Sequence, residues 1–139
     1  MLSFNHYAYG AVIDWVVRHV AGLAPDPAAP GYRHVVLAPR PAIGVDRAEA
    51  SIDSAYGTVA IGWRIEGGEF HAQVQLPFGT RGTLRVPASL GAPISVNGSP
   101  ARASAGFVGL GPGRHEVRAA EAVVVDPAVT SVSREPGRR

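Results

Sequence analysis

The stretch that decides the fold is Thr58–Leu76, TVAIGWRIEGGEFHAQVQL. Apolar residues alternate with small or polar ones on both sides of Gly67-Gly68, and a period of two residues indicates strands with one buried face. Consecutive glycines tolerate the positive φ of a two-residue hairpin turn. The residues expected to face a core are Val59, Ile61, Trp63, Ile65, Phe70, Ala72, Val74 and Leu76, while His71, Gln73 and Gln75 are expected outward.

Further short strands are expected on both sides of this hairpin. Glycine, proline and an Asn-Gly pair recur as turn signals and divide the chain into short alternating segments. Together with the hairpin they give roughly seven to nine strands, which is typical of an antiparallel β-sandwich over residues 31–118. The additional strands are expected at Arg33–Ala38, Val45–Asp53, Leu84–Val86, Ile94–Val96, Ala101–Ala103, Phe107–Leu110 and Arg114–Arg118.

The N-terminal segment Ser3–Leu23 is predicted to form one long α-helix of about five turns. It is apolar almost all round, and only Asp14 and Arg18 give it a solvated edge. Gly22 and Pro25 are the expected stop signals. Because one sandwich cannot cover every side of such a helix, the isolated chain is predicted to self-associate through it.

The expected organisation therefore has four parts. Residues 1–24 form the helix, 25–30 a proline-rich linker, 31–118 the sandwich, and 119–139 an edge strand and a disordered tail. There are thirteen basic residues and no cysteine. The basic residues are scattered, so no nucleic-acid surface is expected. Polar residues in the N-terminal segment exclude a membrane span there. The sequence leaves two compartments open for the protein, cytoplasmic or secreted.

Two blocks carry a resemblance to a known family: FNHYAYGAV at residues 4–12 and PGYRHVVLAPRP at residues 30–41. They resemble the C-terminal end of bacterial α-L-rhamnosidases (glycoside hydrolase family 78). The resemblance implies that residues 1–24 are the last helix of an (α/α)6 toroid and that a β-sandwich follows. It also implies that the complete enzyme hydrolyses terminal α-L-rhamnose with inversion and without a cofactor, with the toroid as partner of this chain.

No catalytic residue is expected in this chain. Glycoside hydrolysis needs two carboxyl groups placed on opposite sides of the scissile bond. The eleven acidic residues offer no convincing pair, and the acid and base of the family lie upstream of the segment that this chain resembles. The isolated chain is therefore expected to be inactive.

His6 is the candidate substrate-binding residue, with Asn5 and Tyr7 as weaker candidates. The resemblance implies that His6 reaches the bound rhamnose, a task that suits an imidazole because it can donate to or accept from a hydroxyl. Helix capping and core packing are the alternative roles for all three residues.

Other residues leave alternatives open. The remaining histidines show no spacing for a metal site. Tyr32, Arg33, His34 and Arg40 either help to seat the sandwich on the toroid or are polar residues of an ordinary first strand. For the whole chain, the alternative is a stand-alone carbohydrate-binding or structural β-sandwich module.

Overall fold

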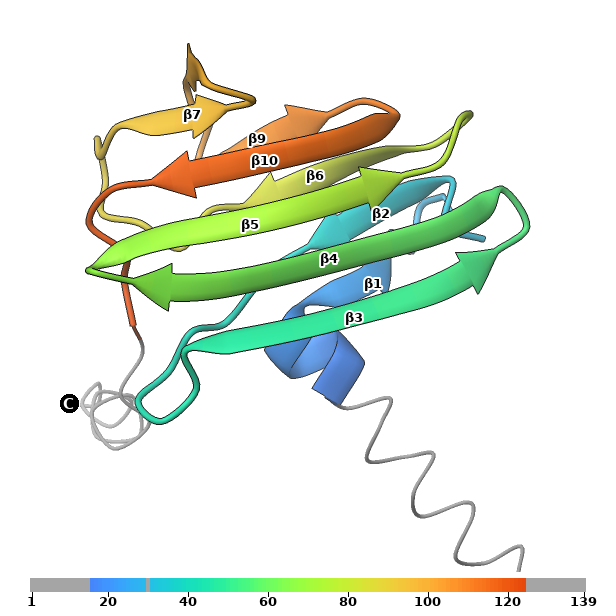
Figure 1. Cartoon of the computed structure of the whole chain (residues 1–139). Coiled ribbons are helices and arrows are strands. Elements are labelled where there is room, and N and C mark those ends of the chain that lie inside the picture. The colour runs from blue at the N-terminus through green and yellow to red at the C-terminus, as the bar shows by residue number, and fades with distance from the viewer. Residues whose placement is uncertain (1–15, 30, 125–139) are drawn as a thin grey trace, which may run out of the picture.

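A computed structural model describes residues 16–29 and 31–124, which form two packed β-sheets (Figure 1). The strands are short and follow one another with few residues between them, as the recurrent turn signals predict. The fold class is therefore mainly β, as expected. The elements are η1 (Val16–Ala21), β1 (Leu23–Pro25), β2 (His34–Leu37), β3 (Arg47–Ser54), β4 (Gly57–Glu66), β5 (Glu69–Leu76), β6 (Arg81–Arg85), β7 (Ile94–Val96), β8 (Ser99–Ala101), β9 (Phe107–Leu110) and β10 (Gly113–Ala119).

The larger sheet has six antiparallel strands in the order β3-β4-β5-β10-β7-β8. Its centre is the hairpin predicted from Thr58–Leu76, with Glu66 opposite Glu69 at the turn. Gly67 and Gly68 have φ of 60° and 80°, the positive values that a primed turn demands. The Asn97-Gly98 turn between β7 and β8 also has positive φ at both residues.

The smaller sheet has four strands in the order β1-β2-β6-β9. Here β2 and β6 are parallel, with His34 opposite Arg81, so the purely antiparallel prediction was wrong for this pair. The reason is the path of the chain: between β2 and β6 it forms β3, β4 and β5 in the other sheet. A connection of that length permits a parallel pair, which a hairpin does not.

The core lies between the two sheets and includes the predicted inward residues of the hairpin. Trp63 is 3% exposed and Phe70 is fully buried, and the centroids of their rings lie 6.5 Å apart. The prediction of Trp63 as a core residue is therefore confirmed. His71 lies on the outer face of the sheet, as predicted, but its side chain is only 11% exposed, and its Nε2 lies 3.4 Å from Oε1 of Glu69.

The predicted N-terminal helix is not seen as one long helix. Residues 1–15 lie outside the described part of the chain, and within Ser3–Leu23 the described helical segment is the six-residue π-helix η1. It ends at Ala21, since Gly22 has a φ of 86°, and the carbonyl oxygen of Gly22 accepts a hydrogen bond from the N–H of Ala38 at 2.7 Å.

Leu23–Pro25, predicted as helix end and linker, instead forms β1 beside β2. This strand raises the number of strands to ten. At the other end, β10 stops at Ala119, and Ala122 forms an isolated bridge with Ala88. Residues 125–139, which include most of the predicted edge strand and tail, lie outside the description. Within residues 16–29 and 31–124, no helix has the length and apolar character needed to cross a membrane.

Candidate functional site

The sugar contacts predicted from the sequence, His6 with Asn5 and Tyr7, lie outside the described residues. The candidate sites in the described part are two hollows on the outer faces of the sheets, that is, the faces turned away from the core. We refer to them as the Gln73 groove and the His34 hollow.

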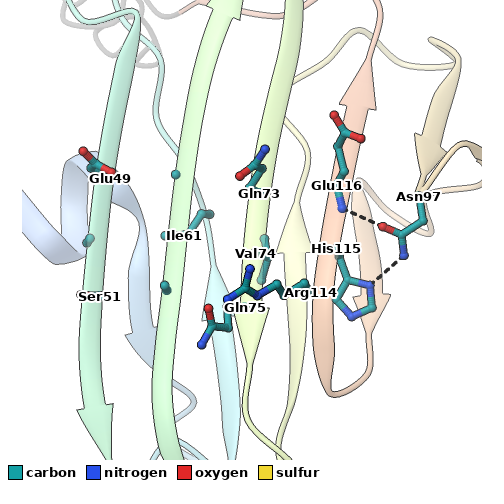
Figure 2. Close-up of a pocket in the computed structure, with 13 residues that line it drawn as sticks. Glu49, Ser51, Ile61, Gln73, Val74, Gln75, Asn97, Arg114, His115 and Glu116 are labelled. Carbon is teal, nitrogen blue, oxygen red and sulfur yellow. Dashed lines mark hydrogen bonds between the residues drawn. The ribbon is translucent and has the colours of Figure 1, made fainter.

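The Gln73 groove crosses the middle of the six-stranded sheet and encloses about 750 Å³. It exists because the outward residues at its floor are small: Ser51 on β3, and Ala60 and Gly62 on β4. A Cβ at Gly62 would lie 3.6 Å from the Cβ of Glu49. The remaining polar residues that line the groove are Glu49, Gln73, Gln75, Asn97, Arg114, His115 and Glu116 (Figure 2).

One wall of the Gln73 groove is held by hydrogen bonds. Asn97 accepts from the backbone N–H of Glu116 at 2.8 Å and contacts Nδ1 of His115 at 3.3 Å. Nε2 of His115 lies 2.8 Å from the carbonyl oxygen of Gly111. On the neighbouring strand, Gln75 lies directly opposite Arg114 (Figure 2). Amide, carboxylate and guanidinium groups on a rigid sheet can bind hydroxyl groups, and the lining contains no phenylalanine, tyrosine or tryptophan.

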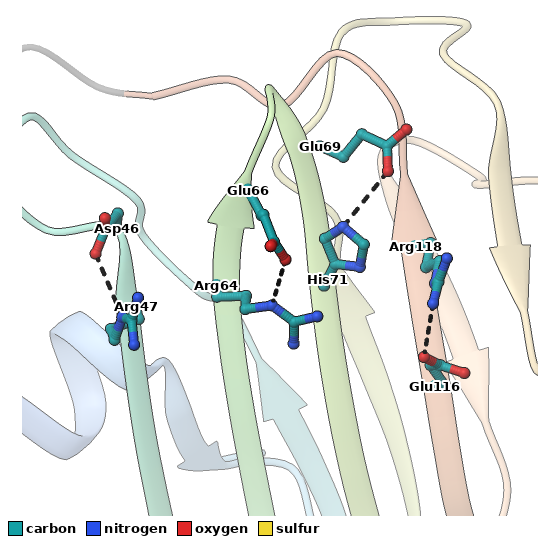
Figure 3. Close-up of polar contacts among 8 residues, drawn as sticks. All are labelled: Asp46, Arg47, Arg64, Glu66, Glu69, His71, Glu116 and Arg118. Carbon is teal, nitrogen blue, oxygen red and sulfur yellow. Dashed lines mark hydrogen bonds and ion pairs between the residues drawn. The ribbon is translucent and has the colours of Figure 1, made fainter.

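At one end of the same sheet, most acidic residues form ion pairs with an arginine or a histidine (Figure 3). Arg64 donates to Glu66 at 2.9 Å, and this hydrogen bond holds the pKa of the Glu66 carboxyl below its usual value. Glu116 lies 3.3 Å from Arg118. A general acid for glycoside hydrolysis needs the opposite, a raised pKa that keeps the carboxyl protonated. The Glu66 carboxylate is therefore poorly suited to that role.

The His34 hollow lies on the outer face of the four-stranded sheet and encloses about 980 Å³. Nδ1 of His34 lies 2.9 Å from Oδ2 of Asp26, and its Nε2 lies 2.8 Å from the hydroxyl of Thr83. The backbone N–H of Ala28 donates to Asp26 at 3.0 Å, which lowers the pKa of the Asp26 carboxyl, and His34 lowers it further. The imidazole is thus fixed between two partners.

Arg33 and Arg81 also line the His34 hollow. The sequence had singled out Arg33 and His34, and the structure places both at this hollow, whereas Tyr32 packs against the core. Sequence reasoning missed Thr83 and Arg81, since β2 and β6 meet only through their long-range pairing. In residues 16–29 and 31–124, no group of three acidic residues or histidines is placed to hold a metal ion.

The fold defines a β-sandwich domain of two sheets. Comparison with known proteins then gives the family: the description that matches residues 22–99 is "Bacterial alpha-L-rhamnosidase C-terminal domain". The match covers more than half of the chain, and the chain belongs to this family.

Curated relatives support the same assignment. The chain is 42% identical over 88 residues to an α-L-rhamnosidase of Streptomyces avermitilis, and 36% identical over 87 residues to one of Formosa agariphila. Each match covers 63% of this chain but only 8% and 9% of the respective relative. The chain therefore corresponds to a small part of these enzymes.

Solved structures agree. The α-L-rhamnosidase of Streptomyces avermitilis, complexed with L-rhamnose, matches with a TM-score of 0.69 and 35% identity, over 83% of this chain and 11% of that one. The enzyme of Aspergillus terreus gives a TM-score of 0.64 and 29% identity, over 83% and 12%. The enzyme of Dictyoglomus thermophilum, at 19% identity and a TM-score of 0.71 over 81% and 14%, shows the shared fold.

Proposed function

We propose that this chain is the C-terminal part of an α-L-rhamnosidase and that its task in the complete enzyme is mechanical. In this proposal its N-terminal segment is the last helix of an α/α toroid, and the sandwich packs against that toroid. The complete enzyme hydrolyses terminal α-L-rhamnose with inversion. The observation that carries the proposal is the match of residues 22–99 to the C-terminal domain of these enzymes.

The chain by itself is proposed to be inactive. Inverting hydrolysis requires one protonated and one ionised carboxyl group about 6.5–9.5 Å apart. Support comes from the described acids, of which Asp26, Glu66, Glu69 and Glu116 are each paired with a histidine or arginine. His6, with Asn5 and Tyr7 as weaker contributors, is proposed to supply one wall of the rhamnose pocket once the toroid is present.

The test is reconstitution. A related α-L-rhamnosidase truncated before its C-terminal domain is mixed with this chain, and release of p-nitrophenol from p-nitrophenyl α-L-rhamnoside is followed. We expect no hydrolysis by the chain alone and recovery of activity on mixing. His6→Ala should weaken the recovered activity, whereas His115→Ala, in the Gln73 groove, should not. Hydrolysis by the chain alone would contradict the proposal.

The alternative function, a stand-alone carbohydrate-binding module, is favoured by one observation, the polar Gln73 groove. Titration of the chain with L-rhamnose tests it. Binding that is lost when Gly62→Leu fills the groove would support this function. Sedimentation of the same sample tests the proposed self-association through the N-terminal segment, for which a monomer would be the contrary result.

A further inference from the structure

We propose that the His34 hollow binds a sugar acid, that is, a polyhydroxylated molecule with one carboxylate. Arg33 and Arg81 would hold the carboxylate, and Thr83 would contact a hydroxyl group. This inference is independent of the rhamnosidase proposal, because it rests on the outer face of the four-stranded sheet alone.

The charge of the hollow comes from its two arginines. Both are exposed, and within residues 16–29 and 31–124 neither guanidinium has an ion-pair or hydrogen-bond partner. Arg81 is opposite His34 in the parallel register, so the two side chains share one face. Guanidinium groups bind planar carboxylates through parallel hydrogen bonds. Two of them around one hollow therefore favour an anion.

The nearby carboxylate of Asp26 does not repel an anionic ligand from the hollow, because it has partners of its own. Asp26 bonds to Nδ1 of His34 and to the N–H of Ala28, and it is not among the residues that line the hollow. Because a carboxylate only accepts, Nδ1 carries the hydrogen, and in the neutral ring Nε2 accepts from Thr83. The hydroxyl oxygen of Thr83 then keeps its lone pairs for a hydroxyl donor on the ligand.

Gly109 makes room for the ligand. It lies directly opposite Thr83 on β9, and a Cβ added there would meet no atom within 4 Å. The missing side chain leaves Thr83 accessible from the side of β9. At about 980 Å³ the hollow is also large enough for a monosaccharide, since ligand pockets span about 300–1,000 Å³.

The experiment is a titration of the whole chain with sodium D-glucuronate, followed by backbone amide NMR shifts. D-Glucose has the same ring without the carboxylate, and inorganic phosphate supplies an anion without the ring. We expect glucuronate to bind with a Kd of about 1 mM and to shift Gly79, Gly109 and Gly111, and we expect both comparison compounds to bind about tenfold more weakly. Equal binding of phosphate or of glucose would overturn the proposal, as would shifts confined to the Gln73 groove or no binding at all.

Variants locate the contacts. Arg81→Gln should weaken glucuronate binding about tenfold or more. Arg85→Gln is the matched control, since Arg85 lies on the same strand and face but does not line the hollow. Gly109→Val should fill the hollow and abolish binding without lowering the unfolding temperature. Retained binding in Gly109→Val, or an equal loss in Arg85→Gln, would refute the site.

Discussion

The sharpest stability prediction concerns Gly22, which joins η1 to β1. Its φ of 86° lies in the left-handed region, where an L side chain is strained. A Cβ at this position would also lie 2.3 Å from the carbonyl carbon of Ala38 and 2.5 Å from the nitrogen of Pro39. Because these atoms belong to the backbone, Gly22→Ala can be accommodated only if the chain itself moves.

The expected cost has two parts. The left-handed conformation costs an alanine about 1–2 kcal/mol, and forcing extra atoms into a packed region costs about 1–3 kcal/mol. The free energy of unfolding should therefore fall by about 2–5 kcal/mol, a large part of the roughly 5–15 kcal/mol that stabilises a typical domain. At roughly 5 °C per kcal/mol, the unfolding temperature falls by about 10–25 °C.

Gly44→Ala is the matched control. Gly44 has nearly the same φ, 88°, but a Cβ there would meet no atom within 4 Å. It should lose only the conformational part, about 1–2 kcal/mol. Circular dichroism melts and urea unfolding of both variants give the comparison. Equal losses of unfolding free energy in the two variants would contradict the steric contribution of Ala38 at Gly22.

Two further predictions concern the core and Asp26, the partner of His34. Phe70→Ala should lower the free energy of unfolding by about 3–5 kcal/mol, because the ring is fully buried. The control Phe78→Ala, at a position 91% exposed, should change it by less than about 0.5 kcal/mol in the same urea assay. Similar losses in the two variants would refute the core assignment. The N–H of Ala28 and the ring of His34 lower the pKa of Asp26, so its stabilising contribution is present above the unfolded pKa and is lost as the pH falls through the folded value. The difference in stability between the wild type and Asp26→Asn should therefore shrink below about pH 4, and a difference that is constant from neutral to acid pH in urea titrations would contradict this.

Much of the fold could be predicted from the sequence because the strands and turns depend on local signals. The alternation around Gly67-Gly68 identified the central hairpin and the inward position of Trp63. The prediction failed at Leu23–Pro25, where the apolar run indicated a helix end. There the exposed edge of β2 supplies hydrogen-bond partners, and the chain forms a strand instead. The candidate site residues His6, Asn5 and Tyr7 lie outside the described part of the chain.

By itself, then, the sequence determined most of the strands, the turns of the central hairpin and which face of that hairpin is apolar, since these properties repeat within a few residues. Only the tertiary structure decided which strands pair. It set β2 beside β6 in parallel and thereby brought His34 within 2.8 Å of Thr83, 49 residues away along the chain. Such contacts depend on how the two sheets form around a shared core, and no local pattern of residues encodes them.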